Sequence, residues 1–319
     1  MRKLLLFAGI FFSFVLSCKY STKDKNTDIE SFGRSVLNIN ESDYFHSLYP
    51  LSAKDITSTH IITQIHEGLV KYHPKDLTVQ PAIAKKWKID TTGTVYTFYL
   101  RNDVFFHDNE CFNDSKGRKV TAADFLYTFQ MLCTKDQYNN SFYGTLDKVK
   151  GAKKYYNASD SCQPDFHIEG IKALNDTTLQ ISLESEHPLL IYFLSGPSAV
   201  VIPKEGFEKY GYDNYVGAGP FYFSDKPQNN KQLTLIKNQK YYKKDKNDVR
   251  LPYLDSVKFS FVGSVQKELE MFTNHEIDLI SGLPNDIVAD FMEEYIEKFE
   301  GNPPDYLLKQ SEEDYESEI

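Results

Sequence analysis

Metal-binding patterns of cysteine are missing from this sequence. Its 319 residues include four cysteines, and no two of them form a Cys-x-x-Cys pair. The spacings of Cys111, Cys133 and Cys162 match no usual zinc module. Cys111 and Cys162 lie in polar stretches and could form a disulfide in an oxidising compartment, whereas Cys133 follows an apolar helical pattern. The sequence therefore predicts no zinc module and leaves one disulfide open.

Catalytic signatures are missing as well. His66-Glu67 begins like the HExxH motif of zinc peptidases, but Val70 stands where the second histidine ligand belongs. No G-x-S-x-G nucleophile elbow occurs in the chain. The glycines at 217 and 219 are too few for a phosphate-binding loop, and Pro220 removes an amide that such a loop would use. We therefore expect a protein that is not an enzyme and carries no cofactor.

A basic stripe along the sequence is missing too. The chain holds 36 Lys and Arg against 45 Asp and Glu, a formal net charge of −9. A surface of this sign repels polyphosphate backbones, so nucleic acid is not an expected partner.

The chain has one long hydrophobic run, at its start. Residues 4–16 are apolar and follow Arg2 and Lys3, and this run is shorter than the roughly 20 residues that a membrane span needs. It has the proportions of a secretory signal peptide. The run ends in "VLSC", which resembles a bacterial lipobox. We expect a signal peptide over 1–17, a lipidated Cys18, and a polar tether over 18–35, which together predict a lipoprotein anchored in the cell envelope, facing the periplasm or the exterior. An ordinary signal peptide with a chance cysteine is the alternative.

The stretch "YTFYLRNDVFFHDNEC", residues 96–111, ends in a cluster of possible metal ligands. Its His107, Asp108, Glu110 and Cys111 are residue types that bind borderline metals. Successive side chains of an extended segment alternate in direction, however, so they converge poorly on one ion. We interpret the cluster as a surface loop, and a hydrolase or metalloenzyme built on it is our least favoured hypothesis.

Hydrophobic periodicity indicates intermixed strands and helices. Residues 95–100 alternate as a strand does, and Thr121 with Asp124 has capping-box spacing for a helix over the next residues. A helix with an apolar face is expected after a cap at Ser58 or Thr59. Further elements are expected at 35–39, at "ALNDTTLQISL", at "GAGPFYF" with "KQLTLIKN", at "DSVKFSFV", at "IDLIS", and as an acidic helix over 285–301. This mixture without strict alternation predicts α/β lobes with mixed sheets.

Seven segments, in order, resemble solute-binding protein family 5, the extracytoplasmic receptors of peptide and nickel ABC importers. They are Glu67-Gly68-Leu69, "PAIA" (81–84) with Trp87, Tyr96 to Asp108, Thr121 to Phe125, "GAGPFYF" (217–223), "LIKNQKYY" (235–242) and "EIDLISGLP" (276–284). The resemblance implies a periplasmic-binding-protein-like α/β fold of type II with an extra domain. It further implies lobe I at 36–55 plus 178–284, lobe II at 56–177, and the start of a third lobe at 285–319 that is largely missing.

The resemblance also implies a site and partners. Extended peptides would be held by main-chain hydrogen bonds, and a monomer would deliver them to a permease and its ATPase. Family members contact ligand near positions that correspond here to Glu41 and Tyr44 in lobe I and to Phe142 and Tyr143 in lobe II, each of which could equally be an ordinary loop or core residue. Trp87 and Phe98 are expected in the core. Nickel, haem or an oligosaccharide as solute, and a shortened chain without a working cleft, remain alternatives.

Overall fold

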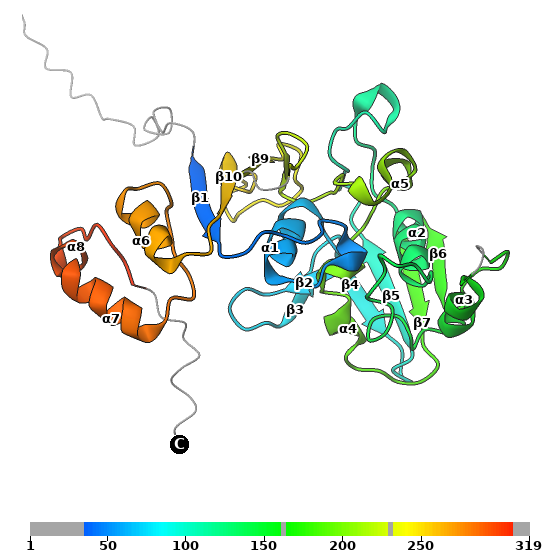
Figure 1. The fold of residues 1–319 in the computed structure, drawn as a ribbon. Helices are drawn as coiled ribbons and strands as arrows, with labels where there is room; N and C mark the ends of the chain where they lie inside the picture. Colours follow the sequence, from blue (N-terminus) through cyan, green and yellow to red (C-terminus); the bar gives the residue numbers. More distant parts are fainter. Residues whose placement is uncertain (1–34, 161–163, 229–231, 309–319) are drawn as a thin grey trace, which may run out of the picture. The chain divides into compact units, whose positions relative to one another are not determined.

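A computed structural model describes residues 35–160, 164–228 and 232–308 of the chain, and Figure 1 shows their fold. All of these residues fall within one compact unit. The expected signal peptide, Cys18 and the tether up to residue 34 lie outside the described residues, and so does Cys162, which leaves its pairing with Cys111 a prediction. In the described ranges, no helix is both long and apolar enough to cross a membrane.

The first sheet has four strands in the order β1, β10, β9, β8. β1 runs parallel to β10, and the other neighbours are antiparallel. β1 is therefore an edge strand, although a single parallel bridge joins Ile39 to Leu279 on its outer side. The strand bounds are Val36–Glu41 (β1), Phe221–Phe223 (β8), Leu233–Lys237 (β9) and Ser256–Phe261 (β10).

Helix α1, Ile56–Ile65, covers this sheet with its isoleucines. The predicted cap at Ser58 or Thr59 is wrong, because the helix begins after Asp55, whose Oδ1 accepts a hydrogen bond of 2.7 Å from the Ser58 N–H. Aspartate is as good an N-cap as serine, and Asp55, Ser58 and Thr59 lie close together. The sequence alone therefore did not decide which of them begins the helix. The buried core beneath the helix contains Ile61, Ile62, Ile65, Phe221, Leu235 and Phe259.

The second sheet has the order β4, β5, β7, β6, with all neighbours antiparallel. The alternation predicted for residues 95–100 is confirmed: Tyr96, Phe98 and Leu100 are buried, and the residues between them are half-buried. The bounds are Ala84–Ile89 (β4), Val95–Leu100 (β5), Ile171–Asn175 (β6) and Thr178–Ser182 (β7), and a short separate pair joins Val70–Tyr72 (β2) to Val79–Pro81 (β3).

The pairing of β7 corrects one predicted lobe boundary. A division before residue 178 separates β6 from β7, whereas the two strands form a hairpin and β7 also pairs with β5. A division that leaves this sheet intact has to come after Ser182. The hairpin turn was visible in the sequence, but the pairing of β7 with β5, about 80 residues away along the chain, was not.

Helix α2, Ala122–Leu132, lies against β6 and β7 of the second sheet (Figure 1). Its predicted capping box is confirmed, with the Thr121 N–H donating to Asp124 Oδ2 at 2.8 Å. Phe125, Phe129 and Leu132 are fully buried on its inner face.

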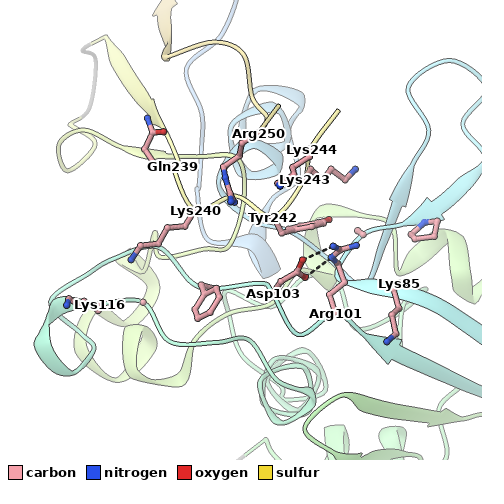
Figure 2. A pocket seen from close by; sticks show the side chains of 14 residues that line it. Lys85, Arg101, Asp103, Lys116, Gln239, Lys240, Tyr242, Lys243, Lys244 and Arg250 are labelled. Carbon is pink, nitrogen blue, oxygen red and sulfur yellow. Dashed lines mark hydrogen bonds and ion pairs between the residues drawn. The ribbon is translucent and has the colours of Figure 1, made fainter. Parts of the chain in front are cut away.

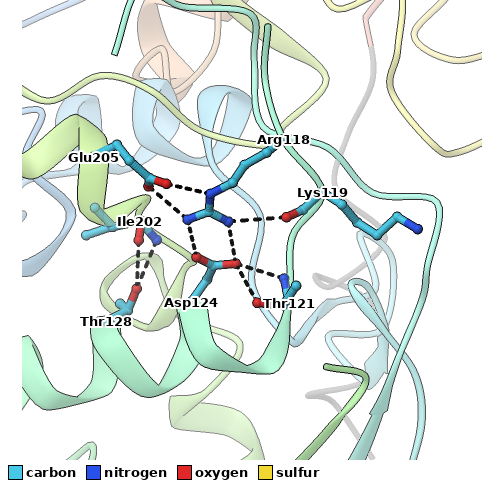
Figure 3. A network of polar contacts seen from close by, with 7 residues as sticks. All are labelled: Arg118, Lys119, Thr121, Asp124, Thr128, Ile202 and Glu205. Atoms are coloured by element: carbon cyan, nitrogen blue, oxygen red, sulfur yellow. Dashed lines mark hydrogen bonds and ion pairs between the residues drawn. The ribbon is translucent and has the colours of Figure 1, made fainter. Parts of the chain in front are cut away.

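Asp124 also anchors an arginine clamp, drawn in Figure 3. The Arg118 guanidinium donates to both carboxylate oxygens of Asp124, at 2.7 and 3.0 Å, and to both of Glu205, at 2.6 and 2.8 Å. Glu205 belongs to helix α5, Lys204–Tyr210, so the clamp joins the start of α2 to α5. Bidentate pairs of this kind are the strong form of ion pair, and this one fixes residues 118–124 next to the buried core that packs on the second sheet.

The remaining helices connect the sheets and end the described chain. The strand expected at "IDLIS", residues 277–281, is not formed: this segment makes a single isolated bridge, at Leu279, and is otherwise irregular. The helix expected over 285–301 is two helices, because Tyr295, at φ −113° and ψ 29°, leaves helical geometry. Their bounds are Ala152–Ala158 (α3), Leu190–Phe193 (α4), Lys204–Tyr210 (α5), Val265–Thr273 (α6), Asn285–Glu294 (α7) and Ile296–Glu300 (α8).

Candidate functional site

Glu41 and Tyr44 lie where β1 ends and the chain turns towards α1. The Glu41 carboxylate is 14% exposed and lies 2.9 Å from Nδ1 of His60 on α1. Tyr44 donates its hydroxyl to the Gln228 carbonyl at 2.8 Å. Its ring contacts Phe45 and Phe261, with ring centroids 4.2 and 4.6 Å away. The end of β1 therefore carries a carboxylate beside an aromatic cluster.

The outer edge of β1 presents main-chain groups next to this carboxylate. The Glu41 carbonyl accepts from the Val262 N–H on the β10 side, whereas the Asn38 carbonyl accepts from the Asp278 N–H on the other side. Because strand residues alternate, the N–H and C=O of Asn40 face the same outer side as those of Asn38. The parallel bridge between Ile39 and Leu279 takes its hydrogen bonds from the outward main-chain groups of the flanking Asn38 and Asn40, so the Asn40 N–H already faces the Leu279 carbonyl. The outward C=O of Asn40 lies beyond this bridge, and among the described residues no main-chain donor from 277–280 reaches it.

The side chain of Asn40 holds this edge in place. Its Nδ2 donates to the Val262 carbonyl and to Glu268 Oε1, both at 2.9 Å, and its Oδ1 accepts from the Val262 N–H at 2.9 Å. These bonds tie β1 to the end of β10 and to α6, which stiffens the edge while leaving its main chain in position.

Phe142 and Tyr143 lie in the other half of the fold and differ from each other. Phe142 is 1% exposed and stacks flat on Tyr156, with ring centroids 4.1 Å apart and planes 4° apart. A side chain buried to this extent contacts the core and not a solute, so its predicted role in binding is corrected. Tyr143 is 66% exposed. The structure thus groups Glu41 with Tyr44 and places Phe142 in the core that packs on the second sheet.

Trp87 and Phe98 behave as expected. Phe98 is fully buried, and Trp87 packs against the same core.

The cluster at 107–111 does not form a common site. His107 is buried between two main-chain groups, with Nε2 3.0 Å from the Gly219 carbonyl and Nδ1 accepting from the Gly217 N–H at 3.3 Å. Burial lowers the pKa of His107 to about 4, so it is neutral at pH 7. Its neighbours have other partners: Asp108 pairs with Lys240 and Glu110 with Lys209.

Burial raises the pKa of Cys111 to about 11, which keeps its thiol protonated. Across the part of the chain that the structure describes, no group of three or more His, Cys, Asp or Glu is placed to hold a metal ion. The metalloenzyme hypothesis therefore has no site at residues 107–111.

A buried carboxylate that the sequence analysis did not recognise as a site joins two distant segments. Glu67 is 5% exposed and accepts from the hydroxyls of Tyr241 and Tyr242, at 2.7 and 3.1 Å. Lys71 Nζ completes the set at 3.0 Å. Burial and the charge of Glu67 raise the pKa of both tyrosines well above their usual value, so both remain donors. Glu67 appeared in the sequence only as part of an incomplete zinc motif.

Beside this network lies a hollow of about 920 Å³, which Figure 2 shows from close by. At its middle the Arg101 guanidinium stacks over the Tyr242 ring, 4.7 Å from the ring centroid, and pairs with Asp103 at 2.8 and 2.9 Å. Two segments supply its walls, residues 81–117 and residues 239–250.

Comparison with known proteins assigns the chain to a family. The model of the bacterial extracellular solute-binding proteins, family 5 Middle, matches residues 78–309, which is more than half of the chain. The chain belongs to solute-binding protein family 5. This confirms the resemblance drawn from the seven segments, and a solute-binding family agrees with the expectation that the chain is not an enzyme.

Relatives of this family 5 protein include oligopeptide-binding proteins. The oligopeptide-binding protein OppA of Bacillus subtilis is 30% identical over 285 residues, which cover 86% of this chain and 48% of OppA. Among solved structures, an oligopeptide-binding protein of Borrelia burgdorferi superposes with a TM-score of 0.69 at 27% identity, over 82% of this chain and 50% of that one. Listeria monocytogenes OppA bound to peptide gives 0.65 at 26%, over 77% and 46%. The chain spans about half the length of the relatives it matches.

Proposed function

We propose that this family 5 protein binds peptides in extended conformation along the outer edge of β1. The observation that carries the proposal is the outward C=O of Asn40, which lies beyond the bridge to Leu279 and next to the Glu41 carboxylate. A peptide laid along this edge gains main-chain hydrogen bonds that do not depend on its side chains. The kinship with oligopeptide-binding proteins supports this choice of solute.

The aromatic cluster of Tyr44, Phe45 and Phe261 provides an apolar surface next to the edge. Tyr143, which is mostly exposed, is the remaining aromatic candidate for contact with the peptide. In the resemblance to family 5, a third lobe would close over the peptide from the opposite side.

Calorimetry of the purified chain with di- to hexapeptides tests this proposal, with Ni²⁺, haem and an oligosaccharide as competing solutes. We expect heat and a rise in Tm for peptides of several sequences, because main-chain recognition tolerates different side chains. Peptides that leave Tm unchanged, beside a response to one of the other solutes, would replace peptide with that solute.

We further propose that the protein is a monomeric, envelope-anchored lipoprotein that passes its solute to an ABC permease driven by an ATPase. The sequence pattern at residues 1–18 and the extracellular character of the family support this. Mass spectrometry of the mature N-terminal peptide tests the anchor. We expect Cys18 as the first residue, carrying the mass of a diacylglycerol, and an unmodified N-terminus at another residue would contradict it.

A further inference from the structure

The hollow beside Arg101 has a charge opposite to that of the protein as a whole. The chain has a net charge of −9, yet this surface carries seven Lys and Arg side chains and only one carboxylate, that of Asp103. We call it the basic hollow; its cations are Lys85, Arg101, Lys116, Lys240, Lys243, Lys244 and Arg250. Such a concentration of one sign in an acidic protein creates a local positive potential.

Three of these cations already have a carboxylate partner. Arg101 pairs with Asp103, Lys240 with Asp108 at 2.6 Å, and Lys244 with Asp248 at 2.8 Å. The ion pairs found among the described residues include none for the other four cations, which are Lys85, Lys116, Lys243 and Arg250. Within the described part of the chain, the basic hollow therefore has four cations without an ion pair of their own. The pKa of Asp103 is lowered by its hydrogen bonds with Arg101 and, to a smaller extent, by the charge of Arg250. Against the effect of burial, the pKa of Asp108 is lowered by Lys240 and, to a smaller extent, by the charge of Lys116. Arg250 also donates to the Tyr241 carbonyl at 2.7 Å.

Lys243 is the most constrained of the four. It is half-buried and lies next to Lys71, a second ammonium group. The carboxylate nearby, Glu67, is already satisfied by Lys71 and the two tyrosines. Burial and the charge of Lys71 lower the pKa of Lys243 to about 8. Two like charges in a partly desolvated place are unfavourable, and an anion bound beside them would offset their repulsion.

The shape and lining of the basic hollow indicate the kind of anion. A volume of about 920 Å³ lies in the range of small-molecule sites and exceeds what a bare inorganic ion fills. Pro81, Ala82 and the partly exposed ring of Phe105 add an apolar wall. Lysines act as point charges that suit the tetrahedral oxygens of phosphate, whereas Asp103 already occupies the fork of Arg101 that best fits a carboxylate.

We propose that the basic hollow binds an organic phosphate, with Lys243 and Arg250 as its principal charge partners. None of its lining residues belongs to β1 or to the segment from Glu41 to Tyr44, so this site is separate from the proposed peptide edge. The phosphate could belong to a soluble ester or to the headgroup of an anionic membrane lipid. Both sources present the same phosphoryl group to the same lysines.

The test compares the full chain with two single-charge variants. Lys243→Gln removes a cation of the basic hollow and, because it relieves repulsion from Lys71, should leave Tm unchanged or raised. Lys135→Gln is the matched control, since it removes one charge from an exposed pair with Asp160 on another part of the surface. Each protein is titrated calorimetrically with phenyl phosphate, an organic ester whose ring suits the apolar wall, and separately sedimented with phosphatidylcholine vesicles with and without phosphatidylglycerol.

We expect the unaltered chain to bind in at least one arm. In that arm Lys243→Gln should weaken binding about tenfold, equivalent to ~1.4 kcal/mol, while Lys135→Gln stays within about twofold. Binding of phenyl phosphate assigns a soluble ester, and binding that needs phosphatidylglycerol assigns a lipid headgroup. No binding in either arm, or equal losses in both variants, would overturn the proposal.

Discussion

Asp124 serves two structures at once, and replacing it separates their contributions. Its carboxylate accepts from the Thr121 N–H in the capping box and forms a bidentate pair with Arg118. Asp124→Asn keeps an amide oxygen for the cap but removes the charge that faces the guanidinium. Asp124→Ala removes both interactions. The two variants therefore measure the clamp alone and the clamp together with the cap.

The expected magnitudes follow from exposure. The side chain of Asp124 is 6% exposed, and that of Arg118 is 36% exposed. Removing one partner of a fully buried ion pair costs about 3–5 kcal/mol. Because Arg118 reaches solvent and keeps Glu205, we discount this to about 2 kcal/mol for Asp124→Asn. Loss of the cap adds roughly 1 kcal/mol, so Asp124→Ala should cost about 3 kcal/mol.

Urea denaturation followed by tryptophan fluorescence measures these costs directly. Trp87 is the only tryptophan of the chain, and it lies on β4 of the second sheet. Glu208→Gln is the control, because it breaks an exposed pair with Lys204 that should contribute under about 0.5 kcal/mol. An Asp124→Asn cost no larger than that of the control would refute the clamp as a stabilising interaction.

Two further predictions use other buried groups. Phe142→Ala should lower the free energy of unfolding by about 3–5 kcal/mol in urea denaturation, whereas Tyr143→Ala should change it by less than about 0.5 kcal/mol; equal costs would contradict the assignment of Phe142 to the core. Burial lowers the pKa of His66 to about 3 and that of His107 to about 4. Between about pH 6.5 and pH 4 the unfolded chain therefore binds more protons than the folded chain, because its histidines keep their ordinary pKa. The free energy of unfolding falls as the pH drops through this window. The loss should reach roughly 2 kcal/mol per histidine at pH 5, measured from urea midpoints at pH 7 and 5, and an unchanged midpoint would contradict it.

Local patterns in the sequence predicted the elements that depend on neighbours along the chain. The alternation at 95–100 and the capping box of Thr121 and Asp124 both involve residues within a few positions, and both are confirmed. The cap of α1 was missed because Asp55, Ser58 and Thr59 are all good capping residues. Periodicity detects a helix more securely than it detects where the helix begins.

Features built from distant segments were not predicted. Glu67 meets Tyr241 and Tyr242 across about 170 positions, and the basic hollow brings residues 81–117 next to residues 239–250. No basic stripe is visible along the sequence, because these lysines come together only when the chain folds. Phe142 and Tyr143 are adjacent aromatics, and tertiary packing alone decided which of them was buried.

The peptide edge of β1 is the central claim, and methylation of single main-chain nitrogens in the peptide tests it most directly. A peptide held along a strand edge donates main-chain N–H groups to the carbonyls of that strand, and the outward C=O of Asn40 is the acceptor beyond the bridge to Leu279. Calorimetry with a tetrapeptide that the chain binds should show the affinity reduced about three- to tenfold, equivalent to one hydrogen bond, when the nitrogen that faces this edge is methylated. Equal affinities for the parent tetrapeptide and for each singly methylated version would contradict binding along this edge.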